Sequence, residues 1–223
     1  MGVTLTGHKI CTFNCVYCQL GRTQGTASER REYLPIEDIL EELNSWIANN
    51  TQKAKELAYI TLSGSGEPTL NIKIAQLIAG IRKITAVPLA VITNSSLLDI
   101  PEVRKDLQEA DLIVPSLDAV TDGVFQRVDR PNHQIKIEHI IQGLKDLRRE
   151  FKGKIWLEVM LVKGINDDLR HIKKIKEAID QIKPDKVQVN LPVRSTAEPG
   201  IAPPNKSKLA KIKKILGDNC EIV

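Results

Sequence analysis

The sequence predicts an α/β protein with a parallel sheet, arranged as a partial (β/α)6 TIM-like barrel in a single domain over residues 1–223. Short continuous apolar runs, typical of parallel strands covered on both faces, alternate with segments whose apolar residues recur at helical spacing. A closed eight-unit barrel typically needs about 250 residues, whereas this chain has 223. With about six strand–helix units, an open partial barrel fits better than a closed one, and a doubly wound sheet is the alternative.

Strands are expected at six places along the chain. They are predicted at residues 2–6, 59–63, 89–93, 112–115, 155–162 and 186–190. Repeated strand–helix units imply parallel strands joined by right-handed crossovers. The carboxyl ends of these strands should therefore meet at one side of the barrel, where such folds bind their ligands.

Helices are expected between these strands. Ile36, Leu43 and Ile47 lie on one apolar stripe, and Asn71 is a candidate N-cap for the helix that follows it. The Pro-rich residues 198–204 are predicted to form a loop before the last helix. In order, helices are predicted at residues 36–47, 72–82, 103–107, 138–150, 169–182 and 206–216.

The composition is that of an ordinary soluble globular protein. Hydrophobic residues make up 42% and charged residues 27% of the chain, which argues against disorder. No apolar run approaches the roughly 20 residues that span a bilayer, and residues 1–9 lack the apolar stretch of a secretion signal. We therefore expect a cytoplasmic protein with no membrane partner. The net charge of +4 is too small to indicate a nucleic-acid binder by itself.

Three of the four cysteines lie within eight positions, directly after the first predicted strand. Cys11, Cys15 and Cys18 have the spacing C-x3-C-x2-C, and Cys220 stands alone near the other end. Adjacent cysteines in a cytosolic chain indicate metal or redox chemistry rather than a disulfide framework. Iron–sulfur clusters usually have four cysteine ligands, so three cysteines on one loop would leave one iron open for a substrate or cofactor.

Three other interpretations of these cysteines are open. Zinc can be held by the three cysteines together with His8, because histidine is a normal zinc ligand. Cys15 and Cys18 also form a C-x-x-C pair of the kind that takes part in redox exchange. Buried structural thiols are the third interpretation, although three so close together are unusual. The local spacing favours the iron–sulfur cluster, with zinc next.

The cysteine segment resembles the radical S-adenosylmethionine (SAM) superfamily. Tyr17 occupies the aromatic position of a C-x3-C-x-aromatic-C motif that follows a first strand. The resemblance implies a [4Fe–4S] cluster on Cys11, Cys15 and Cys18, with the amino and carboxylate groups of SAM on the open iron. It also implies a reducing electron donor such as flavodoxin or ferredoxin. SAM would then be cleaved to methionine and a 5′-deoxyadenosyl radical that abstracts hydrogen from a substrate.

The second predicted strand ends in a glycine-rich segment, residues 63–69. Glycines let the backbone approach a ligand closely, and a carboxylate beside them can accept hydrogen bonds from an ammonium group. Ser65, Gly66 and Glu67 resemble the family's Gly-Gly-Glu segment, which implies contact with the methionine amino group of SAM. Ser65 stands where the family has its first glycine. The alternative is an ordinary glycine-rich turn.

Polar side chains at the other strand ends complete the expected SAM site. The resemblance places Asn94, Ser116 and Asp118 against the ribose and the methionine carboxylate of SAM. Arg130 is assigned to the SAM carboxylate or to an anionic substrate, and Asn190 to the adenosyl end or the substrate. The alternatives are helix caps for the first three residues and a surface salt bridge for Arg130.

The expected function is that of a radical SAM iron–sulfur oxidoreductase with an unassigned substrate. Residues 8–21 and 63–70 most resemble the branch of iron–sulfur oxidoreductases that includes the tRNA wyosine-base synthase. That relative carries additional cysteines for a second cluster, and this sequence has no such set. RNA base modification, with tRNA as a partner, is therefore one expected reaction class, and lysines on the last helix can contact phosphates.

Other functions are carried as alternatives. The first is an activase that makes a glycyl radical on a partner protein. The second is a zinc-binding nucleic-acid module without catalysis, and the third is a metabolic barrel enzyme with incidental cysteines. No catalytic residue is assigned, and His133, His139 and His171 are interpreted as surface residues because they have no partner pattern.

Overall fold

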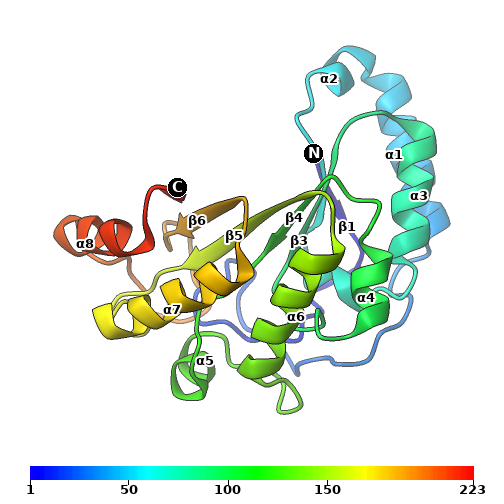
Figure 1. The fold of residues 1–223 in the computed structure, drawn as a ribbon. Helices are drawn as coiled ribbons and strands as arrows, with labels where there is room; N and C mark the ends of the chain where they lie inside the picture. Colours follow the sequence, from blue (N-terminus) through cyan, green and yellow to red (C-terminus); the bar gives the residue numbers. More distant parts are fainter.

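The structure, a computed structural model, describes all residues from Met1 to Val223 and contains one sheet of seven parallel strands. The strands lie side by side in chain order, and the first and last form the two free edges of the sheet (Figure 1). The expected open, partial barrel is confirmed. The strands are β1 (Gly2–Thr4), β2 (Ile60–Ser63), β3 (Leu89–Thr93), β4 (Leu112–Pro115), β5 (Lys154–Met160), β6 (Lys186–Asn190) and β7 (Cys220–Ile222).

Strand β7 was not expected from the sequence. It has only three residues, which is too short for a periodic pattern to be recognised, and it owes its place to pairing with β6. Val187 is aligned with Cys220, and Val189 with Ile222. The barrel therefore has seven strands rather than six, and its last strand follows the last helix.

Eight α-helices connect the strands. They are α1 (Ile36–Asn49), α2 (Thr51–Lys55), α3 (Ile74–Ile84), α4 (Pro101–Asp106), α5 (Asp122–Val128), α6 (Ile137–Glu150), α7 (Leu169–Ile182) and α8 (Lys206–Leu216). Right-handed crossovers between strands in sequential order all pass over the same face of a sheet. Helices α1 and α3 accordingly lie near the β1 edge, and α7 and α8 lie near the β6–β7 edge (Figure 1). None of these helices combines the length and apolar composition that a membrane crossing requires.

Two features differ from the predicted helix pattern. Helices α2 and α5 and the 3-10 turn η1 (Pro68–Leu70) were not expected, because each is too short to show a full helical period. Asn71 does not cap α3, since Lys73 stands at that position. Instead the Asn71 side chain accepts from the Lys73 backbone N–H at 2.9 Å and donates to the Leu5 carbonyl at 3.4 Å. Asn71 therefore connects the end of η1 to the segment after β1.

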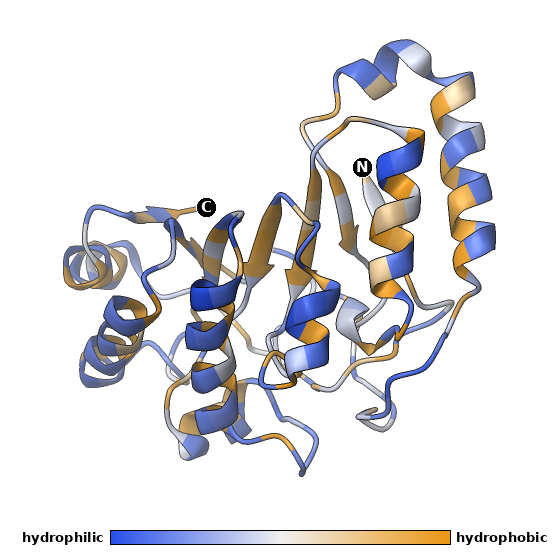
Figure 2. Cartoon of the chain, turned by 45° about the vertical axis from the view of Figure 1, so that its right-hand side comes forward, coloured by the Kyte–Doolittle hydropathy of each residue, from blue (hydrophilic) through white to orange (hydrophobic).

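The main hydrophobic core lies between the sheet and the helices. Figure 2 shows apolar residues along the strands and on the helix sides that face them, with hydrophilic residues turned outward. A small second cluster of Ala90, Leu112 and Val114, with Tyr59 and Trp156 against it, packs apart from the main core. Except for Val114, these residues belong to the amino-terminal halves of their strands or precede them, so most of the carboxyl-terminal half of that face is left for a binding site.

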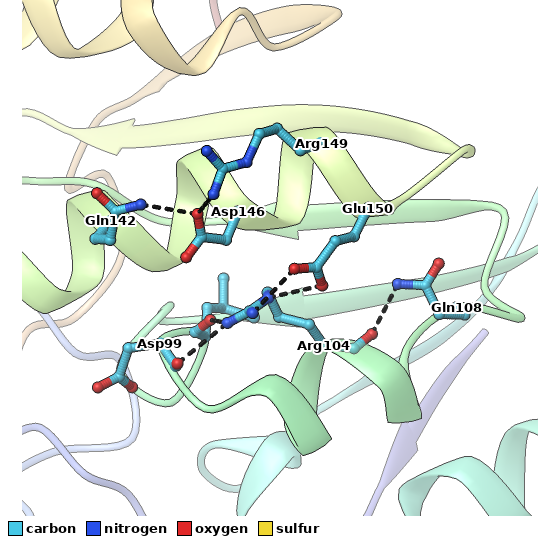
Figure 3. A network of polar contacts seen from close by, with 8 residues as sticks. Asp99, Arg104, Gln108, Gln142, Asp146, Arg149 and Glu150 are labelled. Carbon is cyan, nitrogen blue, oxygen red and sulfur yellow. Dashed lines mark hydrogen bonds and ion pairs between the residues drawn. The ribbon is translucent and has the colours of Figure 1, made fainter.

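A buried arginine holds two of the helices against the segment after β3 (Figure 3). Arg104, on α4, donates Nε and Nη2 to the Glu150 carboxylate of α6 at 2.9 and 3.0 Å. Its Nη1 donates to the Leu98 carbonyl at 2.8 Å. A bidentate, charge-assisted pair of this kind satisfies a buried guanidinium. These contacts hold the segment after β3 in place, and with it the polar residues at the start of that segment.

Candidate functional site

A cavity of about 580 Å³ opens at the carboxyl ends of the strands, where a partial barrel is expected to bind its ligands. We call it the central cavity. The cysteine segment contributes Cys11, Tyr17 and Cys18 to its wall. Strands β2, β3, β5 and β6, or the turns that follow them, contribute further lining residues, among them Gly64, Gly66, Ile92, Glu158, Met160 and Asn190. Segments far apart in the sequence therefore share one cavity.

The rim of the central cavity is apolar. Five large hydrophobic side chains are exposed on this protein, and four of them line this cavity: Leu20, Ile92, Val193 and Val223. Gathering exposed apolar surface at one concave place is typical of a ligand site. The cavity is thus suited to an organic ligand with a sizeable apolar or aromatic part.

The cysteine loop, residues 10–18, is attached at its start to the turn after β2. Ile10 forms a parallel bridge with Gly66, its N–H donates to the Ser65 carbonyl at 3.0 Å, and its carbonyl accepts from the Glu67 N–H at 2.9 Å. A Cβ on residue 66 would lie 1.7 Å from the Ile10 carbonyl oxygen. Only glycine permits this approach, which brings Cys11 beside the glycine-rich turn.

The other end of the cysteine loop rests on α5. The Asn14 N–H donates to the Asp129 carbonyl and the Val16 N–H to the Val128 carbonyl, both at 3.0 Å. The Phe13 ring packs edge-on against Phe125, with ring centroids 5.4 Å apart. The loop is therefore clamped between the β2 turn and a helix that the sequence did not reveal.

The three cysteines are partly buried, and the surroundings of Cys11 and Cys15 oppose thiolate formation. Burial raises the pKa of Cys11 to about 11, and the charge of Glu67 adds to the shift. Burial, and then the Asp129 carboxylate, raise the pKa of Cys15 well above its ordinary value. The Cys15 thiol donates to Asp129 Oδ1 at 3.5 Å, and Cys11 Sγ accepts from Asn94 Nδ2 at 3.5 Å. Without a metal these two thiols hold their protons, so metal binding must release them.

The donor set fits an iron–sulfur cluster better than a zinc ion. No group of three or more His, Cys, Asp and Glu side chains in residues 1–223 is gathered around a position for a single ion. His8, the fourth ligand of the zinc interpretation, is exposed and does not line the central cavity. A cluster joins each cysteine to a different iron, and three thiols spread over one loop suit that arrangement.

Glu67 is buried at the tips of β2 and β3 and is already fully engaged. Its Oε1 accepts from the N–H and hydroxyl of Thr69 and from the Thr93 hydroxyl, at 3.1, 2.7 and 2.7 Å. Its Oε2 accepts from the Asn94 N–H at 2.7 Å. Burial raises its pKa, and these hydrogen bonds act in the opposite direction. The carboxylate binds two strand tips together and does not line the central cavity.

Asn94 connects the β3 tip to the cysteine loop. Its Nδ2 donates to Thr12 Oγ1 at 2.8 Å, and its Oδ1 accepts from the Ser96 N–H at 3.0 Å. The hydroxyls of Thr12 and Ser96 lie 2.8 Å apart. The turn is tight enough that Ser95 adopts a left-handed φ of 69°. Asn94 thus stabilises the turn after β3 and contacts Cys11. It does not cap a helix, because Ile100 stands at the N-cap position of α4.

Tyr17 and Asp118 meet behind the loop. The Tyr17 hydroxyl donates to Asp118 Oδ2, and Asp118 Oδ1 accepts from the Met160 N–H at 2.7 Å. Burial raises the pKa of Asp118 to about 6. Burial, and then the Asp118 charge, raise the pKa of Asp129, whose carboxylate accepts from the Cys15 thiol.

Of the remaining predicted site residues, one lines the central cavity and three lie elsewhere. Asn190 lines the central cavity, and its side chain lowers the pKa of Glu158 on the neighbouring strand, against the larger effect of burial. Ser116 lies at the β4 tip beside Asp118, where its carbonyl accepts from Ser95 Oγ at 2.7 Å. Arg130 does not line the cavity. It donates to Glu198, which agrees with the salt bridge considered as the alternative for this residue. Ser65 contributes mainly its backbone to the site.

Sequence reasoning missed Glu158 and Asp129. Glu158 alternates along β5 with Leu157 and Val159, which are fully buried. The period of two therefore places Glu158 on the opposite face of the sheet from these two residues. Burial, and then the Asp118 charge, raise the pKa of Glu158 to about 7. Asp129 carried no sequence signal, because its contact with Cys15 arises only from the docking of α5.

The interpretation of His171 as a surface residue was wrong. His171 is only 7% exposed. It falls on the same helical stripe of α7 as Ile175, Ala178 and Ile182, which are also buried. Burial lowers its pKa. His139 is exposed, as expected, with Nδ1 3.6 Å from Asp99.

Comparison with known proteins agrees with this geometry. The family model of the radical SAM superfamily matches residues 6–175. A protein of Brachyspira hyodysenteriae named GTPase Obg is 40% identical over 222 residues, which are 100% of this chain and 32% of that protein. A UPF0026 protein of Methanocaldococcus jannaschii is 32% identical over 98% of this chain and 67% of its own length. A probable dual-specificity RNA methyltransferase RlmN of Thermotoga maritima is 28% identical over 94% of this chain and 59% of its own length.

The chain spans a third to two thirds of the length of these relatives. Among solved structures, a radical SAM methyltransferase from Sphaerobacter thermophilus superposes with a TM-score of 0.76 at 16% identity, over 99% of this chain and 64% of that chain. TYW1 with a lysine-pyruvate adduct bound superposes with a TM-score of 0.66 at 20% identity, over 96% of this chain and 72% of that chain. These two likenesses show the shared fold.

Replacing Gly66 by alanine is expected to detach the cysteine loop while leaving the sheet intact. The added Cβ would collide with the Ile10 carbonyl oxygen at 1.7 Å, and neither backbone can yield cheaply. Outer contacts of metal sites typically cost about 10- to 100-fold in metal affinity when lost. Iron content after anaerobic reconstitution should fall accordingly, with unchanged far-UV circular dichroism. Ser65→Ala, which keeps the backbone, should bind iron normally, and normal iron in Gly66→Ala would contradict the clamp.

Glu158 is expected to make stability fall as the pH rises. Its folded pKa of about 7 lies above the ordinary value of about 4.3, so the folded state binds the proton more tightly. The stabilisation is complete below about pH 4 and is lost as the pH rises through about 7. Urea unfolding of the metal-free protein between these limits should show this decline, and it should be flatter in Glu158→Gln. Equal slopes in both proteins would contradict the assignment.

Proposed function

The chain belongs to the radical SAM superfamily, and from this premise we propose that Cys11, Cys15 and Cys18 hold its [4Fe–4S] cluster beside the central cavity, whose wall includes Cys11 and Cys18. The protein is an enzyme of the radical SAM type, with the cluster and SAM as its cofactors. The observation that carries the proposal is that the cysteine loop and the tips of β2, β5 and β6 line one cavity. The substrate class of the whole protein is proposed as well.

The cofactors supply the chemistry, and the chain positions them. When bound, the cluster and SAM supply a 5′-deoxyadenosyl radical that removes a hydrogen atom from the substrate. The cysteine loop presents its sulfurs from between two clamps, the β2 turn and α5. Once ligands fill the cavity, the apolar rim around Leu20, Ile92 and Val193 would keep water from it, and exclusion of water protects a reactive species from side reactions.

SAM is assigned to the wall beside the cysteine loop. Gly64 and Gly66 line the cavity with their backbone alone, and backbone polar groups of this turn suit the methionine part. Asn94, Ser116 and Asp118 lie at adjoining strand tips, and Tyr17 joins the cavity wall to Asp118. Glu67 acts indirectly in this proposal, because its four hydrogen bonds hold the β3 tip in place.

The substrate class that we propose is an RNA base. A relative covering 94% of this chain bears the name of an RNA methyltransferase. The central cavity offers apolar side chains for a planar ring, and the Glu158 carboxylate and Asn190 amide for hydrogen bonds to the edge of a base. Enzymes that act on bases commonly bind them in such a pocket, between apolar groups and polar ones that read the edge.

Replacing Cys15 by alanine should abolish both the cluster and SAM cleavage. Anaerobic wild-type protein should contain about four irons and four sulfides per chain and should form 5′-deoxyadenosine with dithionite. Losing an outer contact already costs about 10- to 100-fold in metal affinity, so losing a ligand should bring both readings to background. Cys220→Ala is the matched control, because Cys220 lies on β7 outside the cavity. A wild-type protein with one zinc and no cleavage would refute the proposal.

RNA is expected to stimulate SAM cleavage and to be chemically modified in the reaction. Reconstituted enzyme with SAM and dithionite should form 5′-deoxyadenosine several-fold faster with total RNA than with the same RNA digested to mononucleotides. Digestion of the product and mass spectrometry should then reveal a nucleoside of changed mass that needs SAM and Cys15. If RNA has no effect, and a partner protein instead acquires a glycyl radical signal in electron paramagnetic resonance, the activase alternative replaces the RNA proposal.

A further inference from the structure

A second concave surface lies on the outer side of the cysteine loop. It is an open depression of about 460 Å³, and its ionisable lining groups are His8, Lys9, Arg22, Arg31 and Tyr33. None of its lining residues is acidic. We call it the basic depression. It is separate from the central cavity, with which it shares only Lys9.

The basic depression is adjacent to the proposed cluster ligands. Ile10 lines it and directly precedes Cys11, and the N–H of Ala27, another lining residue, donates to the Cys11 carbonyl at 2.9 Å. The Lys9 ammonium donates to the Gly21 carbonyl and so closes the base of the cysteine loop. The loop is thus the wall between the two concave surfaces, one of which is left free when SAM and substrate occupy the other.

The positive charge of this surface is only partly neutralised within the chain. Arg22 pairs with Glu198 at 2.8 Å, and Glu198 is shared with Arg130. Glu32, the nearest carboxylate along the chain to Arg31, pairs with Lys73 at 2.8 Å. Arg31 has no carboxylate partner and is exposed, with its guanidinium over the Tyr33 ring, 4.7 Å from the centroid. Unmatched cations around a hollow attract an anionic partner and orient it.

We propose that an acidic electron-transfer protein of the flavodoxin type docks on the basic depression and reduces the cluster from there. The inference rests on the proposed function, because it needs a cluster on the cysteine loop. The carrier loses one electron and the cluster gains it, and no bond is made or broken in this step. A protein carrier is favoured over RNA here because the depression adjoins the cysteine backbone, whereas a base must reach the central cavity on the other side of the loop.

The test compares docking with SAM cleavage in two variants of equal charge change. Arg22→Gln/Arg31→Glu alters the basic depression, and Lys211→Glu/Lys214→Gln alters exposed positions on α8, which packs at the β7 edge. Titration of the reconstituted enzyme with an oxidised acidic flavodoxin at low salt should give about tenfold weaker binding for the first variant, corresponding to about 1.4 kcal/mol. The control should bind normally. With dithionite, which needs no docking, both variants should form 5′-deoxyadenosine at the wild-type rate, whereas reduced flavodoxin should support it poorly only in the first.

The outcomes separate the inference from the function on which it rests. Equal affinities for flavodoxin in wild type and Arg22→Gln/Arg31→Glu, or equal losses in both double variants, would overturn the docking site. Loss of RNA binding in the first variant with unchanged flavodoxin affinity would assign the surface to RNA and would also overturn it. Failure of the wild type to cleave SAM with dithionite would count against the proposed function, while the binding titration would still decide the docking site.

Discussion

The site depends on one close contact between two backbones. The carbonyl oxygen of Ile10 occupies the place that a Cβ of residue 66 would take, and hydrogen bonds on both sides of it join the cysteine loop to the turn after β2. This contact determines where Cys11 lies, and the packing of Phe13 on Phe125 determines the direction in which the loop continues. Two clamps on a short loop give three sulfurs a defined position without any regular structure in the loop itself.

Around that contact the chain buries carboxylates to connect strand tips. Glu67 joins β2 to β3, and Asp118 joins β4 to β5 while accepting from Tyr17. Burying a carboxylate is costly unless hydrogen bonds compensate it, and here backbone N–H groups and hydroxyls do so. The raised pKa values of Asp118 and Glu158 show that compensation is incomplete. Such incomplete compensation is common at functional sites, where stability is secondary to the arrangement of groups.

The cysteine loop also organises the two concave surfaces. It forms part of the wall of the central cavity, where the apolar rim and the Glu158–Asn190 pair lie, and it borders the basic depression on its outer side. Lys9 lines both. On the proposed function and docking site, reduction and substrate chemistry proceed from opposite sides of this loop. The fold leaves both concave surfaces open beside it.

The sequence by itself determined the repeated strand–helix order, the cysteine spacing and the glycine-rich turn, because these features are local and have recognisable periods or spacings. Helix α7 and strands β3, β4 and β6 were predicted to the residue. Only the tertiary structure decided that β7 and α5 form, and which contacts Glu67, Arg130 and His171 make. Short elements gain their stability from partners distant in the chain, and whether a carboxylate faces a cavity or a neighbouring strand depends on contacts that no local pattern encodes.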